Sequence, residues 1–310
     1  MMTDQIYQIK VPASTANLGP GFDSIGLALG LYLEVEAQEA EAWEVIPLSA
    51  GLEVFPKDES HYICKVAWET AQEYGVTLPP CRLLVKSEIP LTRGLGSSAS
   101  AIVAGIELAD SVGGLNLSRE DKVRISSRFE GHPDNAGASV CGGLVVGIHN
   151  GADTELLSIQ LEGVKAIAVI PQYDLPTDES RQVLPDSLPF RAAIEASAVA
   201  NTFLAALLTR NYSLAGRMMG ADLFHQPYRR QLVPHLEEVE KAALAAGAFG
   251  TALSGAGPTA ICLVEKDKAR SASLELKSAF PACEVLLLDI DYGGSQVKFK
   301  DATVSPANHF

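Results

Sequence analysis

The chain has 310 residues, of which 47% are apolar and 20% charged, and its formal net charge is −14. This is ordinary globular composition, and the length suffices for two modest domains or one large one. So acidic a chain repels phosphate backbones and anionic lipid surfaces, which excludes general nucleic-acid or membrane-surface binding. It does not exclude a phosphorylated ligand, since a few local donors and a metal ion can hold a nucleotide.

The cysteines and the N-terminus predict a cytoplasmic protein. The first residues, Met1 to Gln5, lack the basic and apolar regions of a signal peptide, and we expect no apolar run long enough to cross a membrane. The cysteines are scattered and odd in number, which fits a reducing compartment and favours neither a disulfide framework nor a zinc site. They are Cys64, Cys81, Cys141, Cys262 and Cys283.

Apolar residues alternate in some segments, which predicts strands, and recur every three to four residues in others, which predicts helices. In chain order we expect strands at 6–11, 31–37 and 43–48, a helix at 59–74, a strand at 82–86, helices at 98–112 and 118–129, and a strand at 144–148. A polar stretch at 150–155 is the predicted connection between two domains. Then follow a strand at 166–170, a proline-rich polar segment at 171–189, helices at 190–209, 213–221 and 235–246, strands at 251–254 and 259–264, a helix at 266–279 and a strand at 284–289. Because this order lacks the regular alternation of a doubly wound sheet, we predict an α+β fold.

Glycines and serines gather in one loop between a predicted strand and a predicted helix. The loop reads Pro90-Leu91-Thr92-Arg93-Gly94-Leu95-Gly96-Ser97-Ser98-Ala99-Ser100. Gly94 and Gly96 let the backbone turn tightly, and the free N–H groups that begin the following helix favour an anion. The lysine of a Walker loop and the third glycine of the dinucleotide fingerprint are both missing. The loop predicts a phosphate site, with a serine-capped glycine turn as the structural alternative.

Two further motifs carry polar side chains on constrained backbone. Asn17 and Asp23 lie in a loop of small residues and glycines after the first predicted strand, which suits the orientation of a small polar ligand. The segment Glu130-Gly131-His132-Pro133-Asp134-Asn135 packs two acids, a histidine and an amide behind a predicted helix. Its oxygens suit Mg²⁺, whereas no His/Cys spacing supports a transition metal. Ordinary Asx turns and a helix cap remain the structural alternatives.

Together, four segments resemble the signatures of homoserine kinases. This group belongs to the superfamily of galactokinase, homoserine kinase, mevalonate kinase and phosphomevalonate kinase, abbreviated GHMP. The loop at 90–100 resembles the superfamily signature, VPASTANLGPGFDSIGLAL at 11–29 the opening signature of homoserine kinases, EGHPDN at 130–135 their middle motif, and GTALSGAGP at 250–258 the C-terminal glycine motif. The four matches come in the order of the family and span most of the chain.

The resemblance implies a two-domain α+β GHMP kinase fold. Residues 1–152 would form an N-terminal domain like ribosomal protein S5 that carries the phosphate loop, and 153–310 a ferredoxin-like C-terminal domain with substrate-binding arginines. It further implies that ATP phosphorylates the side-chain hydroxyl of L-homoserine, giving O-phospho-L-homoserine on the route to threonine. Mg²⁺ would be the metal, and the protein would commonly be a homodimer.

The resemblance also implies roles for single residues that bind ATP and metal. The loop from Pro90 to Ser100 would wrap the ATP phosphates, Ser98 and Glu130 would bind Mg²⁺, and Thr177 would lie near the γ-phosphate. We assign no contacts to the adenine, because Ser60-His61-Tyr62 departs from the pair that many relatives have there.

Other residues are matched to the amino-acid substrate. Asn17 and Asp23 would hold its amino end or its hydroxyl, and His132 and Asn135 would line the same pocket. Arg181 and Arg229 match two arginines that bind the carboxylate, and guanidinium forks suit that planar group.

The proton of the substrate hydroxyl raises a question of mechanism. The resemblance implies that related mevalonate kinases use an aspartate base and that Asp134 falls near its position, whereas homoserine kinases are described as lacking a strong base there. We hypothesise that Asn17 and Asn135 orient the hydroxyl and that no residue is an obligatory base. The alternatives to this assignment are a sister kinase acting on mevalonate or a sugar, a catalytically silent nucleotide-binding protein on the same scaffold, and a dinucleotide oxidoreductase.

Overall fold

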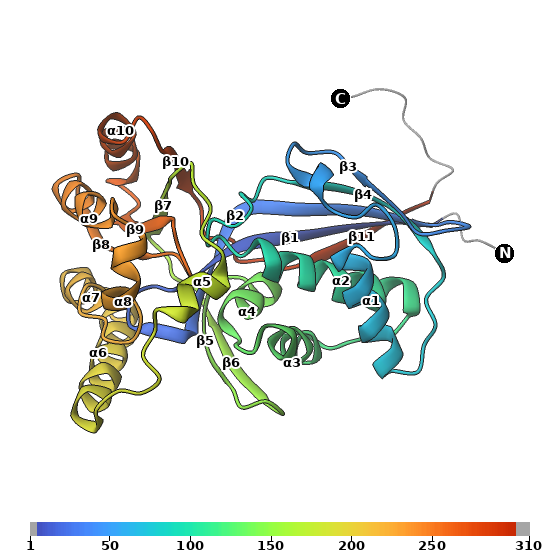
Figure 1. Cartoon of the computed structure of the whole chain (residues 1–310), viewed down its shortest axis with the longest axis horizontal. Helices are drawn as coiled ribbons and strands as arrows, with labels where there is room; N and C mark the ends of the chain where they lie inside the picture. Colours follow the sequence, from blue (N-terminus) through green and yellow to red (C-terminus); the bar gives the residue numbers. More distant parts are fainter. Residues whose placement is uncertain (1–4, 302–310) are drawn as a thin grey trace.

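Two mainly antiparallel sheets, each covered by helices, form the part of the chain that the computed structural model describes, residues 5–301 (Figure 1). The first sheet has seven strands in the order β11-β1-β2-β4-β3, with β5 pairing β2 and β6 pairing β5. These strands are β1 Gln5–Asn17, β2 Gly21–Glu39, β3 Glu44–Pro47, β4 Cys81–Ser87, β5 Leu144–His149, β6 Thr154–Ile159 and β11 Gln296–Asp301. The helices beside this sheet are α1 Tyr62–Glu73, α2 Ser97–Gly113, α3 Arg119–Glu130 and α4 Asp134–Cys141.

The second sheet has four strands in the order β10-β7-β9-β8. They are β7 Val164–Ile170, β8 Ala248–Leu253, β9 Ala260–Glu265 and β10 Glu284–Leu288. The helices of this half are α5 Thr177–Gln182, α6 Phe190–Leu208, α7 Tyr212–Met219, α8 Gln226–Arg229, α9 Leu236–Ala245 and α10 Ala269–Ala279. The predicted α+β class is therefore confirmed.

Alternation along strand β7 explains how the two halves are held together. Ala166, Ala168 and Ile170 face a core cluster that also contains Val11 and Leu27 of the first sheet. The intervening Ile167 and Val169 face a second cluster under α9 and α10. Because the first cluster is continuous between the two sheets, packed side chains fix their relative position and any site between them.

The helix predicted at 118–129 is present as α3, and a capping box begins it. The Ser118 hydroxyl accepts from the Asp121 backbone N–H at 3.0 Å, and the Asp121 carboxylate accepts from the Ser118 N–H at 3.2 Å. These bonds satisfy backbone donors that have no partner within the helix.

The connection between the halves differs from the prediction. The polar stretch at 150–155 is the turn of a hairpin, because His149 of β5 pairs with Thr154 of β6. Strand β11 returns from the second half and pairs antiparallel with β1. In place of a single cut between 152 and 153, we propose a first domain of residues 5–159 with 290–301, and a second domain of the residues between them.

Helix α6 also corrects an expectation. It has 19 residues, and an 18-residue window of them has a mean hydropathy of 1.2, so within residues 5–301 it is the one helix long and apolar enough to cross a membrane. The sequence prediction of no such run overlooked how many alanines this segment adds to its leucines. One helix of this kind is weak evidence for a span, because helices of soluble domains share its length and composition.

Candidate functional site

The phosphate loop is held against both halves of the molecule by its glycines. Gly94 and Gly96 have φ values of 75° and 72°, in the left-handed region that favours glycine. A Cβ at Gly94 would lie 2.2 Å from the Ser254 carbonyl oxygen, and one at Gly96 would lie 2.3 Å from Ser14 Oγ. Gly96 precedes the 17-residue helix α2, whose first N–H groups are free to bind an anion beside the loop.

The four sequence motifs converge on this loop through hydrogen bonds. The Ser254 hydroxyl of the C-terminal glycine motif lies 2.5 Å from the Gly94 carbonyl oxygen and 2.8 Å from Thr15 Oγ1. Ser14 of the opening motif donates to Asn135 Oδ1 of the middle motif at 3.1 Å. Segments far apart in the chain therefore share one bonded framework, with Thr15 and Ser254 separated by 239 positions.

A cavity of about 470 Å³ opens between the two halves at this framework. Its size is that of a small-molecule site. The phosphate loop and α2 line it with Thr92, Gly94, Gly96, Ser97, Ser98 and Ala99. The other predicted site residues that line it are Asn17, Asp23, Glu130, His132, Asn135, Thr177, Arg181 and Arg229.

The remaining loop residues point elsewhere. The side chains of Leu95 and Ser100 are buried, and Ser100 Oγ donates to the Ser97 carbonyl oxygen. Arg93 turns away from the cavity, donates to the Gln172 carbonyl oxygen and forms an ion pair with Asp174. Pro90 and Leu91 precede the part of the loop that reaches the cavity. Their predicted contact with ATP stays a prediction.

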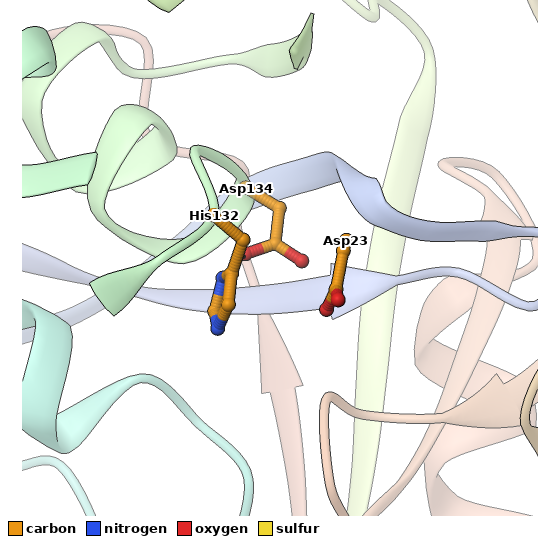
Figure 2. A group of neighbouring side chains, drawn as sticks. All are labelled: Asp23, His132 and Asp134. Carbon is orange, nitrogen blue, oxygen red and sulfur yellow. The ribbon is translucent and has the colours of Figure 1, made fainter. Parts of the chain in front are cut away.

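Three acidic and basic side chains approach one another at the wall formed by the middle motif (Figure 2). His132 Nδ1 lies 2.6 Å from Asp134 Oδ1, and one ligand atom from each of Asp23, His132 and Asp134 falls within 4.8 Å of the others. Burial alone would lower the pKa of His132, but the hydrogen bond and charge of Asp134 raise it to about 9. His132 is therefore a cation at neutral pH and donates its Nδ1–H to the Asp134 carboxylate.

Within residues 5–301 no hydrogen bond engages the Glu130 carboxylate, which leaves it for a metal. Burial raises the pKa of Glu130 to about 7, against the opposing charge of His132. Ser98, at the start of α2, contributes a hydroxyl to the same cavity. A hydroxyl and a carboxylate beside a phosphate loop form the oxygen donor set that Mg²⁺ prefers, so these residues fit that ion.

Two arginines lie beside Phe22, next to the group of Asp23, His132 and Asp134. Arg181 forms a two-pronged ion pair with Asp23, with distances of 2.8 and 3.2 Å. The guanidinium groups of Arg181 and Arg229 lie 5.7 and 5.3 Å from the Phe22 ring centre. Burial, together with the charge of Arg181, lowers the pKa of Arg229 to about 10, so it stays charged at neutral pH.

Asn17 and Asp23 were expected in a loop, but Asn17 is the last residue of β1 and Asp23 lies in β2, with a short turn between the strands. Asn17 ties this turn together at a backbone conformation that is rare outside glycine. Its φ is 73°, its Oδ1 accepts from the Asp23 N–H at 3.0 Å, and its Nδ2 donates to the Gly255 carbonyl oxygen at 3.1 Å. Each end of the amide keeps one further hydrogen-bonding capacity for a ligand. The strained backbone fits a functional position.

Sequence reasoning missed several lining residues. Tyr62, Phe129 and Asp178 line the cavity, as does Phe22. Phe22 lay inside the opening motif, directly before Asp23, so its position was available as a signal. Phe129 and Asp178 directly adjoin the predicted site residues Glu130 and Thr177, and Tyr62 belongs to the segment Ser60-His61-Tyr62, so a similar signal was available for these three.

Comparison with known proteins bears directly on this site. Residues 61–143 match the model of the GHMP kinases N terminal domain, and residues 203–282 match that of the GHMP kinases C terminal domain. The chain is 47% identical to a homoserine kinase of Bacillus velezensis over 95% of its own length and 96% of that protein. The chain belongs to the homoserine kinase family.

Other relatives agree with this membership. A homoserine kinase of Shouchella clausii is 48% identical, over 96% of this chain and 99% of that protein. The crystal structure of a homoserine kinase from Cytophaga hutchinsonii superposes with a TM-score of 0.84 at 26% identity, covering 96% of this chain and 98% of the other. A galactokinase of Lactococcus lactis superposes with a TM-score of 0.70 at 17% identity, which shows the shared fold alone. The assignment to homoserine kinases among GHMP kinases is confirmed.

Proposed function

We propose that this chain transfers the γ-phosphoryl group of ATP to the side-chain hydroxyl of L-homoserine and so supplies O-phospho-L-homoserine for threonine synthesis. Family membership supports an ATP-dependent kinase acting on an alcohol. The observation that carries the choice of an amino-acid acceptor is the Asp23–Arg181 ion pair in the cavity wall.

The ion pair matches a zwitterion end for end. An α-amino acid brings an ammonium for Asp23 and a carboxylate for Arg181, so both charges keep a partner when the pair opens. A hydroxy acid without an amino group would satisfy Arg181 and leave the Asp23 carboxylate unpaired, which is costly in a partly buried site. Mevalonate and sugars are disfavoured on this ground.

The cavity residues supply positioning and charge for the transfer. Loop amides and the N-terminus of α2 stabilise charge on the phosphates, while Asn17 and Asn135 orient the hydroxyl. One carboxylate oxygen of Asp134, Oδ1, contacts His132 Nδ1 and accepts from the Asn135 N–H, each at 2.6 Å, and we propose that Asp134 holds these residues in place and is no obligatory base. Ser98 and Glu130 would hold Mg²⁺, which supplies positive charge against the phosphates when bound.

A panel of acceptors tests this proposal. ADP release is followed with Mg·ATP and L-homoserine, L-serine, L-threonine, mevalonate, galactose or no acceptor, and the product with homoserine is identified as its phosphate ester. Two truncated acceptors complete the panel: 4-hydroxybutanoate lacks the amino group, and 3-aminopropanol lacks the carboxylate. We expect turnover to require both the amino group and the carboxylate of homoserine. The Asp23→Asn variant should reduce the difference in turnover between homoserine and 4-hydroxybutanoate. Strong turnover with mevalonate or galactose alone would refute the substrate assignment.

We further propose a homodimer in the cytoplasm. The feature that supports a dimer is a set of exposed large apolar side chains on α6, where Phe190, Ile194 and Leu208 are 84%, 55% and 45% exposed. All five cysteines are free, which fits a reducing compartment. Light scattering of the purified protein tests the dimer against the 32.8 kDa of a single chain.

A further inference from the structure

Arg229 is buried to an unusual degree for a charged residue that lines a binding cavity. Its exposed fraction is 2%, and its Nε donates to the Ser180 carbonyl oxygen at 3.1 Å. Its Nη1 donates to the Gly255 carbonyl oxygen at 3.1 Å and lies 3.3 Å from His225 Nδ1. Within residues 5–301 no hydrogen bond engages Nη2, which leaves that nitrogen for a ligand in the cavity.

The partners of His225 determine which ring nitrogen carries the proton. Arginine nitrogens only donate, so Nδ1 must accept from Arg229. The other nitrogen, Nε2, lies 2.9 Å from the Gly19 carbonyl oxygen, which only accepts, so Nε2 carries the proton and donates it. His225 is fully buried, and burial lowers its pKa to about 4, with Asp222, Arg229 and Asp23 as the neighbouring charges. The ring is therefore neutral with one defined tautomer.

The surroundings leave this ring little freedom. It stacks on Phe22, with ring centres 5.3 Å apart and an interplanar angle of 20°. The Asp222 carboxylate accepts from the backbone N–H groups of Phe224, His225 and Gln226, which fixes the backbone at the start of α8. His225 thus joins Gly19 of the opening loop, in the first half of the chain, to the guanidinium of the second half.

We propose that His225 is a positioning residue, a neutral Nε2–H imidazole that sets the orientation of Arg229 toward the carboxylate of the acceptor. This inference rests on the proposed function, since it takes Arg229 to bind that carboxylate. His225 does not reach the reacting atoms, so its loss acts on acceptor binding. It is also separate from the phosphate loop, so it leaves ATP binding intact.

Two replacements of His225 each keep the hydrogen bond of one ring nitrogen and remove that of the other. In His225→Asn the amide oxygen can take the place of Nδ1 as the acceptor from Arg229, whereas in His225→Gln the amide nitrogen can take the place of Nε2–H toward Gly19. We expect His225→Gln to raise the KM for homoserine at least tenfold, with kcat and the KM for ATP within about threefold of wild type. We expect His225→Asn to keep the KM for homoserine close to the wild-type value. As a control, His149→Gln, on β5 with Thr154 as its partner, should change neither KM nor kcat.

Nitrogen-15 spectra of the histidine rings in the ligand-free wild type provide a readout that needs no turnover. The expected His225 signal is a neutral ring protonated at Nε2 between pH 5.5 and 8. An imidazolium, a proton on Nδ1, or equal KM increases in both His225 variants would overturn the proposal, as would a fall in thermal stability with no change in KM. If the wild type instead phosphorylates another carboxylate-bearing acceptor, the proposed substrate fails, and the same KM comparison with that acceptor decides the role of His225.

Discussion

Replacing Asp134 with Asn tests whether this carboxylate positions its neighbours or removes a proton. The side chain is 1% exposed and holds His132 Nδ1 and the Asn135 N–H, each at 2.6 Å. The amide keeps the size of the group and one acceptor oxygen but removes the negative charge. The change therefore separates the charge of Asp134 from its shape.

The magnitude follows from the titration of His132. Its pKa rises from 6.5 to about 9, and one pKa unit corresponds to about 1.4 kcal/mol, so the stabilisation of the imidazolium is at most about 3 kcal/mol. Because the pKa of His132 is raised in the folded state, its contribution to the stability of the fold is fully present below pH 6.5 and is lost as the pH rises through 9. We expect Asp134→Asn to lower the free energy of unfolding by about 2 to 3 kcal/mol at pH 6 and by much less at pH 9.5.

Urea unfolding at both pH values measures this difference, and acceptor kinetics test the mechanism. His132→Gln is the matched variant, and its effect should not add to that of Asp134→Asn because the two act through one bond. A positioning role predicts a fall in kcat of less than ~1000-fold, whereas an obligatory base contributes up to ~10,000-fold. A loss beyond ~1000-fold with fold and ATP affinity intact, or an unfolding difference independent of pH, would refute the reasoning.

Three further changes test the metal, the loop and the core. Because protons compete with Mg²⁺ for Glu130, the Mg²⁺ concentration for half-maximal activity should rise roughly eightfold from pH 7.5 to pH 6, and Glu130→Gln should remove that dependence. Gly94→Ala should weaken ATP binding at least about tenfold by calorimetry, whereas Gly51→Ala, with a φ of 86° and no atom within 4 Å of the added Cβ, should not; equal losses would contradict the proposed contact. Phe203→Ala should cost about 3 to 5 kcal/mol in chemical unfolding, against less than about 0.5 kcal/mol for Leu274→Ala, whose side chain is 62% exposed.

Local sequence patterns predicted the helices whose first residues contain capping or glycine-rich motifs. Helix α3, predicted at 118–129, begins with the Ser118–Asp121 capping box, and helix α2, predicted at 98–112, follows the glycines and serines of the phosphate loop. The elements that were missed depend on distant partners. Strand β11 depends on its pairing with β1. The short helix α5 lies in a proline-rich segment, where the Ser180 hydroxyl donates to the Ala256 carbonyl oxygen.

The composition of the cavity was predictable from motifs, but the pairing within it was not. All residues assigned to metal and substrate do line one cavity, while their individual roles stay predictions. No spacing in the sequence indicates that Asp23 pairs with Arg181, 158 positions away, or that His225 joins Arg229 to Gly19. Such contacts depend on how the two halves pack, which periodicity does not encode.

The return of β11 to β1 bears on how the chain is made. The outer edge of β1, the first strand to leave the ribosome, stays unpaired until residues 296–301 have been synthesised. A bare strand edge is a template for pairing between chains. Although domains generally fold in order of synthesis, the amino-terminal half here stays an unfinished sheet on the nascent polypeptide. Translation that stopped before Gln296 would release a product with both the phosphate loop and an open, association-prone edge.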